Sequence, residues 1–321
     1  PVMNRKTIDF AIRLGLACGC QIAPNQHFAR KNYFYPDLPK GYQITQDTTP
    51  ICTGGQILIR TEDGQQKPIG LTRIHMEEDA GKSIHDVDVF DTLVDLNRAG
   101  TPLLEIVSEP DLRSSTEAYN YLTEVRKLLR YLDICDGNME EGSMRCDANV
   151  SVRLVGAKDF GTKVEVKNMN SIRNVQRAIE FEITRQIEAL ESGQTLVQET
   201  RGFDALKGST ISMRTKEAAN DYRYFPEPDL PPIHVSTAHI AQIAAQMPAL
   251  PNALFERYTK SYGLSDYDAY NITDQKGLAL YYEGLIAHTK NYKAAANWLM
   301  GEIKSYLNEQ GIDISSFPLA P

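Results

Sequence analysis

An acidic cluster flanked by a histidine and a lysine is the strongest chemical feature of the sequence. Within residues 73–82, His75 precedes three consecutive carboxylates at positions 77–79, and Lys82 follows them. Hard divalent cations take oxygen ligands, and carboxylates that face each other across a sheet supply them. Residues 69–72 are typical of a strand that runs into the cluster. An isolated acidic run is more often a solvated strand end, so a cation site needs support from elsewhere in the chain.

A carboxylate inside an apolar strand gives that support. Residues 103–107 are apolar apart from Glu105 in their middle. Burying a carboxylate in such a strand is costly unless it is paired or bound to a metal. We therefore expect Glu105 to be a buried site residue, on a strand that follows a turn at residues 98–101.

Cations stand beside aromatic rings in a further segment. Residues 28–37 contain Arg30 and Lys31 among phenylalanine and tyrosine residues. Such groups suit a nucleotide or an RNA end through charge contacts and stacking. A loop whose aromatic side chains anchor in the core explains the segment equally well. The proline-punctuated loop over residues 221–229 has a similar aromatic and charged composition.

A regular polar face is predicted over residues 144–152. Apolar and polar residues alternate there as in a strand, and Arg145, Asp147 and Asn149 lie on the polar side. Such a face either meets water, which is the commoner case, or lines a site. Residues 163–167 alternate in the same way.

Hydrophobic periodicity predicts the elements that position these groups. Helices are expected over residues 8–16, 118–132, 172–190, 253–262, 276–288 and 292–308. Strands are expected over residues 57–59, 67–76, 93–96, 103–107, 144–152, 163–167, 196–200 and 211–214. Ser114 and Glu117 form a capping box, and Asn170 or Ser171 caps a helix that Gly193 ends.

Composition restricts the class of protein. The 321 residues suffice for roughly two domains, and the net charge of -8 argues against indiscriminate binding to phosphate backbones. A local basic patch stays compatible with that charge. Five scattered cysteines without a C-x-x-C pair disfavour a disulfide framework or a structural zinc site and suit a reducing, cytoplasmic setting. No apolar run approaches the roughly 20 residues of a membrane span, and no signal-peptide pattern opens the sequence.

Seven stretches of the sequence match one known family together. They are residues 30–37, 75–82, 96–102, 104–111, 139–149, 161–171 and 221–229. In type and order they resemble the B subunits of the aspartyl/glutamyl-tRNA amidotransferases. Because the resemblance is collinear and covers nearly the whole chain, it is far more specific than any single short motif.

The resemblance implies an α+β fold with two domains. Residues 1–246 would form a catalytic kinase and transamidase domain, an antiparallel-sheet cradle similar to glutamine synthetase. Residues 247–321 would form part of a small all-α domain. The run Pro-Ala-Leu-Pro at residues 248–251 fits a boundary at this place.

The resemblance also implies a reaction that uses ATP and Mg²⁺. The family phosphorylates the side-chain carboxylate of glutamate on tRNA(Gln), or of aspartate on tRNA(Asn), and then amidates it with ammonia. An amidase, the A subunit of the same complex, releases this ammonia from glutamine, and a small C subunit completes the complex. We therefore expect a cytoplasmic carbon–nitrogen ligase that acts on misacylated tRNA and has no membrane contact.

By motif match, Glu78 and Glu105 are the expected metal ligands and catalytic residues. Strand alternation puts Glu77 on the face of Arg73 and His75, and Glu78 on the other face. Alternation alone does not choose between the two glutamates, and the resemblance chooses Glu78.

The other expected site residues are cations and one aspartate. Arg30, Lys31 and Arg73 are the candidates for cofactor binding, through contacts with phosphate. Asp147 is the third catalytic candidate and would orient ammonia or line its channel. Lys163 and Lys167 either line that passage or are merely solvated.

The sequence departs from the family pattern in two ways. Ala29 stands where the family usually has an acidic residue. The family's N-terminal strand, with its Gly-Leu-Glu-Val-His motif and further metal ligands, does not occur, and the helical domain stops short of a tail domain. We therefore expect the sequence to be an internal fragment of a larger catalytic protein.

Two other classes of protein are compatible with parts of the sequence. A nucleic-acid-binding scaffold without catalysis would explain the cations and aromatics of residues 28–37 and the helical end. It would gain nothing from Glu105 inside a strand. A kinase or ligase for a small carboxylate would keep the acidic site but lack a helical tRNA domain, so binding of charged tRNA separates it from the amidotransferase.

Overall fold

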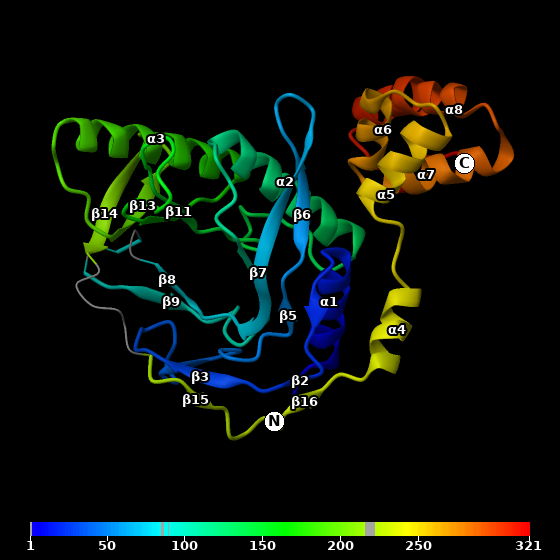
Figure 1. Ribbon diagram of the computed structural model, residues 1–321. Coiled ribbons are helices and arrows are strands. Elements are labelled where there is room, and N and C mark those ends of the chain that lie inside the picture. The colour runs from blue at the N-terminus through cyan, green and yellow to red at the C-terminus, as the bar shows by residue number, and fades with distance from the viewer. Residues whose placement is uncertain (1, 85–86, 89, 216–221) are drawn as a thin grey trace. The chain divides into compact units, whose positions relative to one another are not determined.

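The computed structural model describes residues 2–84, 87–88, 90–215 and 222–321, and the chain forms two compact units (Figure 1). The first unit contains residues 1–124 and 138–246. The second contains residues 125–137 and 247–321. Sheets and helices together make the chain α+β, as predicted.

An antiparallel sheet built around one long strand dominates the first unit. Strand β7 pairs with β4, β5, β6 and β10, and the path β1-β5-β7-β4-β3-β15 completes the sheet. The strands are β1 (Gln21–Ile22), β3 (Ala29–Asn32), β4 (Tyr42–Thr45), β5 (Cys52–Thr53), β6 (Gln56–Arg60), β7 (Gln66–Glu78), β10 (Pro102–Ser108) and β15 (Phe225–Pro226). The predicted strands around residues 57–59, 67–76 and 103–107 are confirmed as β6, β7 and β10.

Helix α1 (Arg5–Ala17) covers the apolar face of this sheet beside β5 (Figure 1). Its Ala11 and Ile12 are fully buried. Cys52 is opposite Ile74 in the β5–β7 pair, and the Cys52 thiol lies 3.6 Å from the Ala11 carbonyl oxygen. Gly15 permits this close approach, because a Cβ there would lie 2.4 Å from the Cys52 sulfur. The face of β7 that carries Ile74 is therefore the face packed on α1.

A second sheet lies under helix α3 (Ile172–Glu191), which crosses β11 and β14 (Figure 1). Its order is β11 (Ala148–Val150), β12 (Val164–Lys167), β13 (Glu199–Asp204) and β14 (Ser209–Thr215), with β12 and β13 parallel. Ser171 is the N-cap of α3, since its side chain accepts from the Asn174 N–H, which settles the choice between Ser171 and Asn170.

The predicted strand over residues 144–152 is mostly wrong, because only Ala148–Val150 pairs as a strand. Turns and bends occupy residues 139–144, and residues 145–147 and 151–152 belong to no strand. The alternation in burial is nevertheless present, with Met144, Ala148 and Val150 buried and Arg145 exposed.

Short elements complete the first unit. They are β2 (Asn25–Gln26) paired with β16 (Ile233–His234), β8 (Lys82–Ile84) paired with β9 (Leu93–Asp95), helix α4 (Thr237–Ala245) and the first part of α2 (Ser115–Tyr131). Ser114 begins α2 as predicted, because its Oγ accepts from the Glu117 N–H at 3.1 Å. Glu117 itself accepts from the Arg113 N–H instead of completing a capping box with Ser114.

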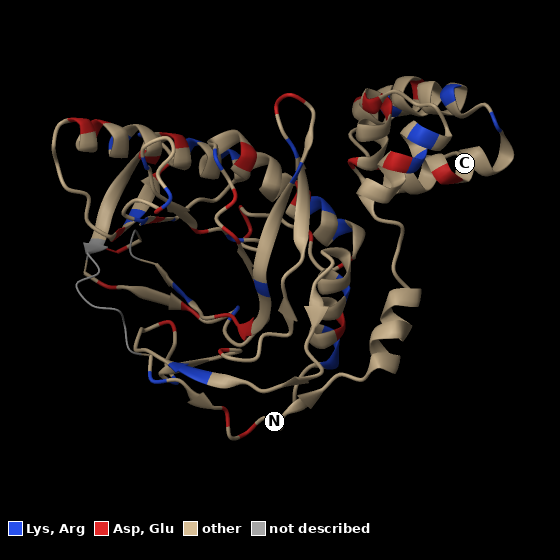
Figure 2. Ribbon diagram, in the orientation of Figure 1, with Lys and Arg blue, Asp and Glu red and all other residues tan. Residues whose placement is uncertain are grey.

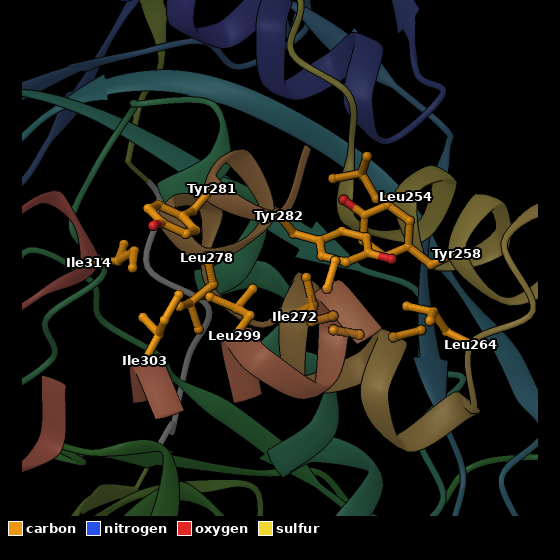
Figure 3. Packing of buried hydrophobic residues seen from close by; sticks show 14 of the residues in the cluster. Leu254, Tyr258, Leu264, Ile272, Leu278, Tyr281, Tyr282, Leu299, Ile303 and Ile314 are labelled. Carbon is orange, nitrogen blue, oxygen red and sulfur yellow. The ribbon is translucent and has the colours of Figure 1, made fainter. Parts of the chain in front are cut away.

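The second unit is a helical cluster with its own core (Figure 3). Its elements are α5 (Pro251–Glu256), η1 (Arg257–Ser261), α6 (Asp266–Thr273), α7 (Lys276–His288), α8 (Tyr292–Trp298), η2 (Leu299–Ile303), α9 (Lys304–Gln310) and η3 (Ile314–Ser316). Tyr258 and Tyr282 pack edge to face with ring centroids 4.9 Å apart, and Ile272 and Leu299 are fully buried beside them. The predicted helices of this region are confirmed, and α6 was missed because its polar residues weaken the apolar stripe.

Candidate active site on the polar face of the main sheet

The pairing of β3, β4 and β7 places polar side chains on one face of the main sheet. Residues directly opposed in a ladder share a face, as do residues two apart on one strand. Lys31 is opposite Gln43, and Thr45 is opposite Glu77. Hydrogen bonds agree with this register. The Thr45 hydroxyl donates to Glu77 Oε1 at 2.8 Å, and Gln43 Nε2 donates to Glu77 Oε2 at 3.2 Å.

The pairing of β7 with β10 extends this face. Glu105 is opposite His75, which is two residues before Glu77 on β7. Since Ile74 faces α1, His75 and its neighbours lie on the other side of the sheet. The set is called the polar row, and it consists of Lys31, Gln43, Thr45, Glu77, His75 and Glu105. Figure 2 shows basic residues on β3 in blue and acidic residues at the end of β7 in red.

One imidazole and two carboxylates converge in the polar row. His75 Nε2 lies 3.0 Å from Glu77 Oε1 and 3.7 Å from Glu105 Oε2. Without a cation, Nε2 would donate to these carboxylates, since an ionised carboxylate only accepts. A bound cation would take the place of that proton. Burial raises the pKa of Glu77, but the hydrogen bonds from His75 and Thr45 and the nearby charge of Lys31 outweigh it, so that pKa lies below its ordinary value.

These three side chains fit a divalent cation. Their ligand atoms lie within 4.8 Å of one another. On the same face, the buried atoms His75 Nδ1 and Arg73 Nε have no hydrogen-bond partner among the described residues. Buried polar atoms are normally satisfied, so two unpartnered ones beside a set of ligand atoms indicate a place for a bound polar group. Carboxylate oxygens suit Mg²⁺ or Mn²⁺, and the imidazole extends the range to transition metals.

The expected burial of Glu105 is wrong, because its side chain is 50% exposed. The apolar run around it suggested a strand covered on both faces. In the structure Ile106, opposite Ile74, lies on the face that packs on α1, and Glu105 lies on the open face. Glu105 therefore remains a candidate site residue because it lies close to other members of the polar row, and not because it is buried.

Glu78 lies apart from this cluster. It is opposite Pro102, an odd number of positions from Glu105, so regular alternation sends the two side chains to different sides. Glu78 Oε1 accepts from the Ile44 N–H at 2.8 Å and pairs with Lys40. The structure thus groups Glu77 with Glu105, and the pairing of Glu78 and Glu105 at one cation stays a prediction.

Lys31 and Arg30 point to opposite faces of β3, as neighbours on a strand must. Lys31 Nζ lies 4.8 Å from the ring centroid of Tyr222 and 5.9 Å from that of Tyr33. The guanidinium of Arg30 is instead engaged by Glu227, with Nε to Oε2 at 2.7 Å and Nη2 to Oε1 at 2.9 Å.

Arg30 is therefore an internal ion-pair partner, and its role in cofactor binding stays a prediction that the geometry does not favour. A contact with an aromatic ring also holds this side chain within the protein, since the Arg30 guanidinium lies 4.1 Å from the ring centroid of Tyr42. Tyr222 begins the described part of the loop expected over residues 221–229, and Asp221 lies outside the described residues.

Asp147 forms an ion pair with Lys167, which also lies 3.5 Å from Glu165. Burial lowers the pKa of Lys167, but the charges of Asp147 and Glu165 outweigh it, so the pKa is raised and the lysine is cationic. Asp147 is about half exposed and Lys163 is exposed. Their roles toward ammonia stay predictions.

Sequence reasoning missed several residues of this face. Gln43 and Thr45 belong to β4, a strand of four residues that is too short to be recognised by periodicity. Asp79 belongs to the acidic run, but its partners Arg98 and Arg145 come from distant segments. Only pairing in three dimensions brings these groups together.

No helix in the described ranges is both long and apolar enough to cross a membrane.

A family model and several curated proteins place the chain in the same family. Residues 1–241 match the family model of the GatB/GatE catalytic domain. The chain is 55% identical over 322 residues to a protein of Alkalilimnicola ehrlichii that is named as the B subunit of aspartyl/glutamyl-tRNA(Asn/Gln) amidotransferase. It is 54% identical over 321 residues to the protein of that name from Myxococcus xanthus, and 57% identical over 324 residues to that from Geobacter sulfurreducens.

Each of these alignments covers all of this chain and 67% of the relative. The chain thus spans about two thirds of the length of the curated relatives that it matches. The family model covers more than half of the chain and includes every strand of the polar row. The chain belongs to the family of GatB/GatE catalytic domains.

Proposed function

We propose that this chain is the catalytic part of the B subunit of a tRNA-dependent amidotransferase. It uses ATP to phosphorylate the side-chain carboxylate of glutamate on tRNA(Gln) or of aspartate on tRNA(Asn). The acyl phosphate is then amidated with ammonia from the amidase partner, the A subunit, in a complex that also contains a small C subunit. Family membership supports this proposal, as do the printed names of the relatives.

The observation that carries the proposal is the polar row. It combines a cation-binding cluster of His75, Glu77 and Glu105 with Lys31, which lies against the rings of Tyr33 and Tyr222. A carboxylate cluster beside a lysine and aromatic rings suits a nucleoside triphosphate, whose phosphates need cations and whose base stacks. A non-catalytic nucleic-acid binder would gain nothing from two carboxylates that converge on one histidine.

The residues of the cluster would hold Mg²⁺, and motif match adds Glu78 to the candidates. When bound, the ion neutralises and orients the phosphates of ATP. The chain's own groups do the rest: Lys31 binds phosphate oxygens, Arg73 offers its Nε, which has no partner among the described residues, and the tyrosines orient the nucleotide. The sheet that carries them would be the antiparallel cradle, similar to glutamine synthetase, that the family resemblance implies.

The first proposed step transfers a phosphoryl group. A carboxylate oxygen of the substrate attacks the γ-phosphorus of ATP, the bond from that phosphorus to the β–γ bridging oxygen breaks, and ADP leaves with that oxygen. A carboxylate is a poor electrophile, so this step creates a leaving group.

The second proposed step forms the amide. Ammonia attacks the carbonyl carbon of the acyl phosphate, the carbon–oxygen bond to phosphate breaks, and inorganic phosphate leaves as the nitrogen loses a proton. Asp147, held by Lys167, would orient the incoming ammonia or accept this proton.

The test uses the full-length protein in its complex with the partner proteins. ATP turnover and amide formation should both require misacylated tRNA. Glu105→Gln should lower both about a hundredfold or more, because it removes a charged group from the cation cluster. Glutamine hydrolysis by the amidase partner should persist.

Asp147→Asn separates the two steps, because acyl-phosphate formation should continue while amide product falls. Glu188→Gln, an exposed change on α3, is the matched control and should leave both activities unchanged. A complex that turned over no ATP with either misacylated tRNA would contradict the proposed function. Equal loss of ATP turnover in the Asp147 and Glu105 variants would move Asp147 to the phosphate site.

A further inference from the structure

Asp79 continues the β7–β10 pairing one residue past the end of β7. Pro102 is opposite Glu78, and the Asp79 N–H donates to the Thr101 carbonyl at 2.8 Å. The Asp79 carbonyl accepts from the Gly100 N–H at 2.9 Å, so two residues of the neighbouring segment bond to this one position. Because Asp79 is two residues beyond Glu77, its side chain lies on the face of the polar row. That side chain is only 4% exposed.

Two arginines from distant segments meet at this carboxylate. Arg98 Nε donates to Asp79 Oδ2 at 3.0 Å, and Arg145 Nη2 donates to the same oxygen. One arginine would suffice to pair a buried aspartate. The second leaves an excess of positive charge beside the acidic cluster. The arginine side chains are 43% and 58% exposed, so the carboxylate holds one edge of each guanidinium and water reaches the rest.

The chain around Arg98 keeps its outer nitrogens accessible. Arg98 Nη1 also lies 3.5 Å from the Glu141 carbonyl, the long limit of a hydrogen bond. Gly142 has a φ of +76°, and a Cβ there would lie 3.4 Å from Arg98 Nη1. Within the described part of the chain, the hydrogen bonds of Arg145 go to Asp79 alone.

We propose that Arg98 and Arg145, positioned by Asp79, form a clamp for the phosphoryl group that passes from ATP to the substrate carboxylate. This inference rests on the proposed function. An arginine fork binds phosphate oxygens through charge-assisted hydrogen bonds, and cationic groups stabilise the charge that spreads over a phosphoryl group in transfer. The acidic cluster alone would repel a triphosphate, whereas the clamp supplies fixed positive charge on the same face.

The clamp predicts recognition of the terminal phosphate in particular. In the full-length complex with its partner proteins, ATP and ADP binding are measured by calorimetry with Mg²⁺ present. Arg98→Gln and Arg145→Gln should each weaken ATP binding about tenfold, the equivalent of one charge-assisted hydrogen bond, and change ADP binding less than about twofold. Arg145→Lys, which keeps the charge, should recover part of the loss.

Asp79 acts only by positioning the two arginines, so we expect its variant to affect nucleotide binding differently from the arginine variants. Asp79→Asn keeps the shape but loosens both guanidinium groups, and it should reduce the preference for ATP over ADP. Arg173→Gln removes an exposed arginine from α3 and serves as the matched control for net charge, with no expected effect on either nucleotide. Thermal unfolding of each variant separates these effects from a loss of folded protein.

Three outcomes would overturn the clamp. ATP and ADP binding could weaken equally, which would make the three residues structural. Both could stay unchanged in the arginine variants. The KM for charged tRNA could rise alone, which would assign the arginines to RNA backbone phosphates. A wild-type complex that bound neither nucleotide would instead contradict the proposed function.

Discussion

Glu77 and Glu78 are neighbours on β7 that have opposite surroundings. Glu77 is hydrogen-bonded to His75 and Thr45 within the polar row, and Glu78 pairs with Lys40 and the Ile44 N–H. The motif match selects Glu78 as the metal ligand, whereas the register favours Glu77. Direct measurement of metal binding decides between them.

We expect Glu77→Gln to weaken Mn²⁺ binding to the full-length complex by about tenfold or more, because it removes a charged ligand from a cluster of three. Glu78→Gln should change Mn²⁺ affinity less. Electron paramagnetic resonance of free Mn²⁺ in a titration measures both without relying on activity. A larger loss for Glu78→Gln would return that residue to the metal site and would show that the strand end rearranges when the cation binds.

Lys31 and Arg30 provide a similar pair of neighbours. Lys31→Gln should raise the KM for ATP several-fold and leave the stability of the protein nearly unchanged, because its contacts are with rings and not with a buried acid. Arg30→Gln should instead destabilise the protein clearly, since it removes the arginine that pairs with the buried Glu227. Urea unfolding and ATP kinetics measured on both variants give the comparison. A specific effect of Arg30→Gln on ATP would contradict the assignment.

At the scale of elements, a buried ionic network attaches α3 to the second sheet. Glu182, with no exposed side-chain area, bonds Arg185 of α3 and lies 3.2 Å from Arg201 of β13. Arg201 in turn pairs with Glu199 at 2.7 Å. Burial raises the pKa of Glu182 and of Glu199, but hydrogen bonds and the arginine charges outweigh it and hold both pKa values below the ordinary range.

This network predicts acid lability of the first unit. A carboxyl group whose pKa is lower in the folded than in the unfolded protein contributes its full stability above the unfolded value, about 4.3 for glutamate, and loses it as pH falls through the folded value. Unfolding by urea from pH 7 to pH 3 should show this loss below about pH 4.3. Glu182→Gln should be less stable at pH 7 and have a flatter pH profile. A profile as steep as that of the wild type would exclude Glu182 as its source.

Local signals in the sequence predicted most elements, because caps and periodicity act over a few residues. Ser171 and the apolar stripe of α3 are examples. The strand expected over residues 144–152 failed because alternation records which side chains are buried and not whether a neighbouring strand is present.

The candidate site was only partly predictable, because residue spacing does not record which strands pair. His75 and Glu105 stand out in the sequence by type and position, but their contact depends on the β7–β10 register. Lys31 joins them only through β4, and Arg98 and Arg145 join only through Asp79. Such long-range pairings have no signature in residue spacing. The family resemblance supplied part of this information, although it named Glu78 where the register favours Glu77.

At the scale of the whole molecule, helix α2 contributes residues to both units. Residues 115–124 belong to the first unit, and residues 125–131 belong to the helical unit. Tyr131 is 2% exposed within the helical core, and its hydroxyl donates to the Thr273 carbonyl at 2.8 Å. The helical unit is therefore not completed by the C-terminal residues alone.

We expect Tyr131→Ala to destabilise the helical unit by about 3–5 kcal/mol, since it leaves a cavity the size of an aromatic ring in the core. Tyr131→Phe removes only the hydrogen bond to Thr273 and should cost about 1 kcal/mol. Tyr119→Ala, at a position of the same helix that is 38% exposed, is the matched control and should have little effect. Hydrogen exchange followed over residues 251–310 measures the stability of this unit separately from that of the sheets. If Tyr131→Ala accelerated exchange no more than Tyr131→Phe, the core of the helical unit would not depend on α2, and residues 247–321 would be expected to fold alone.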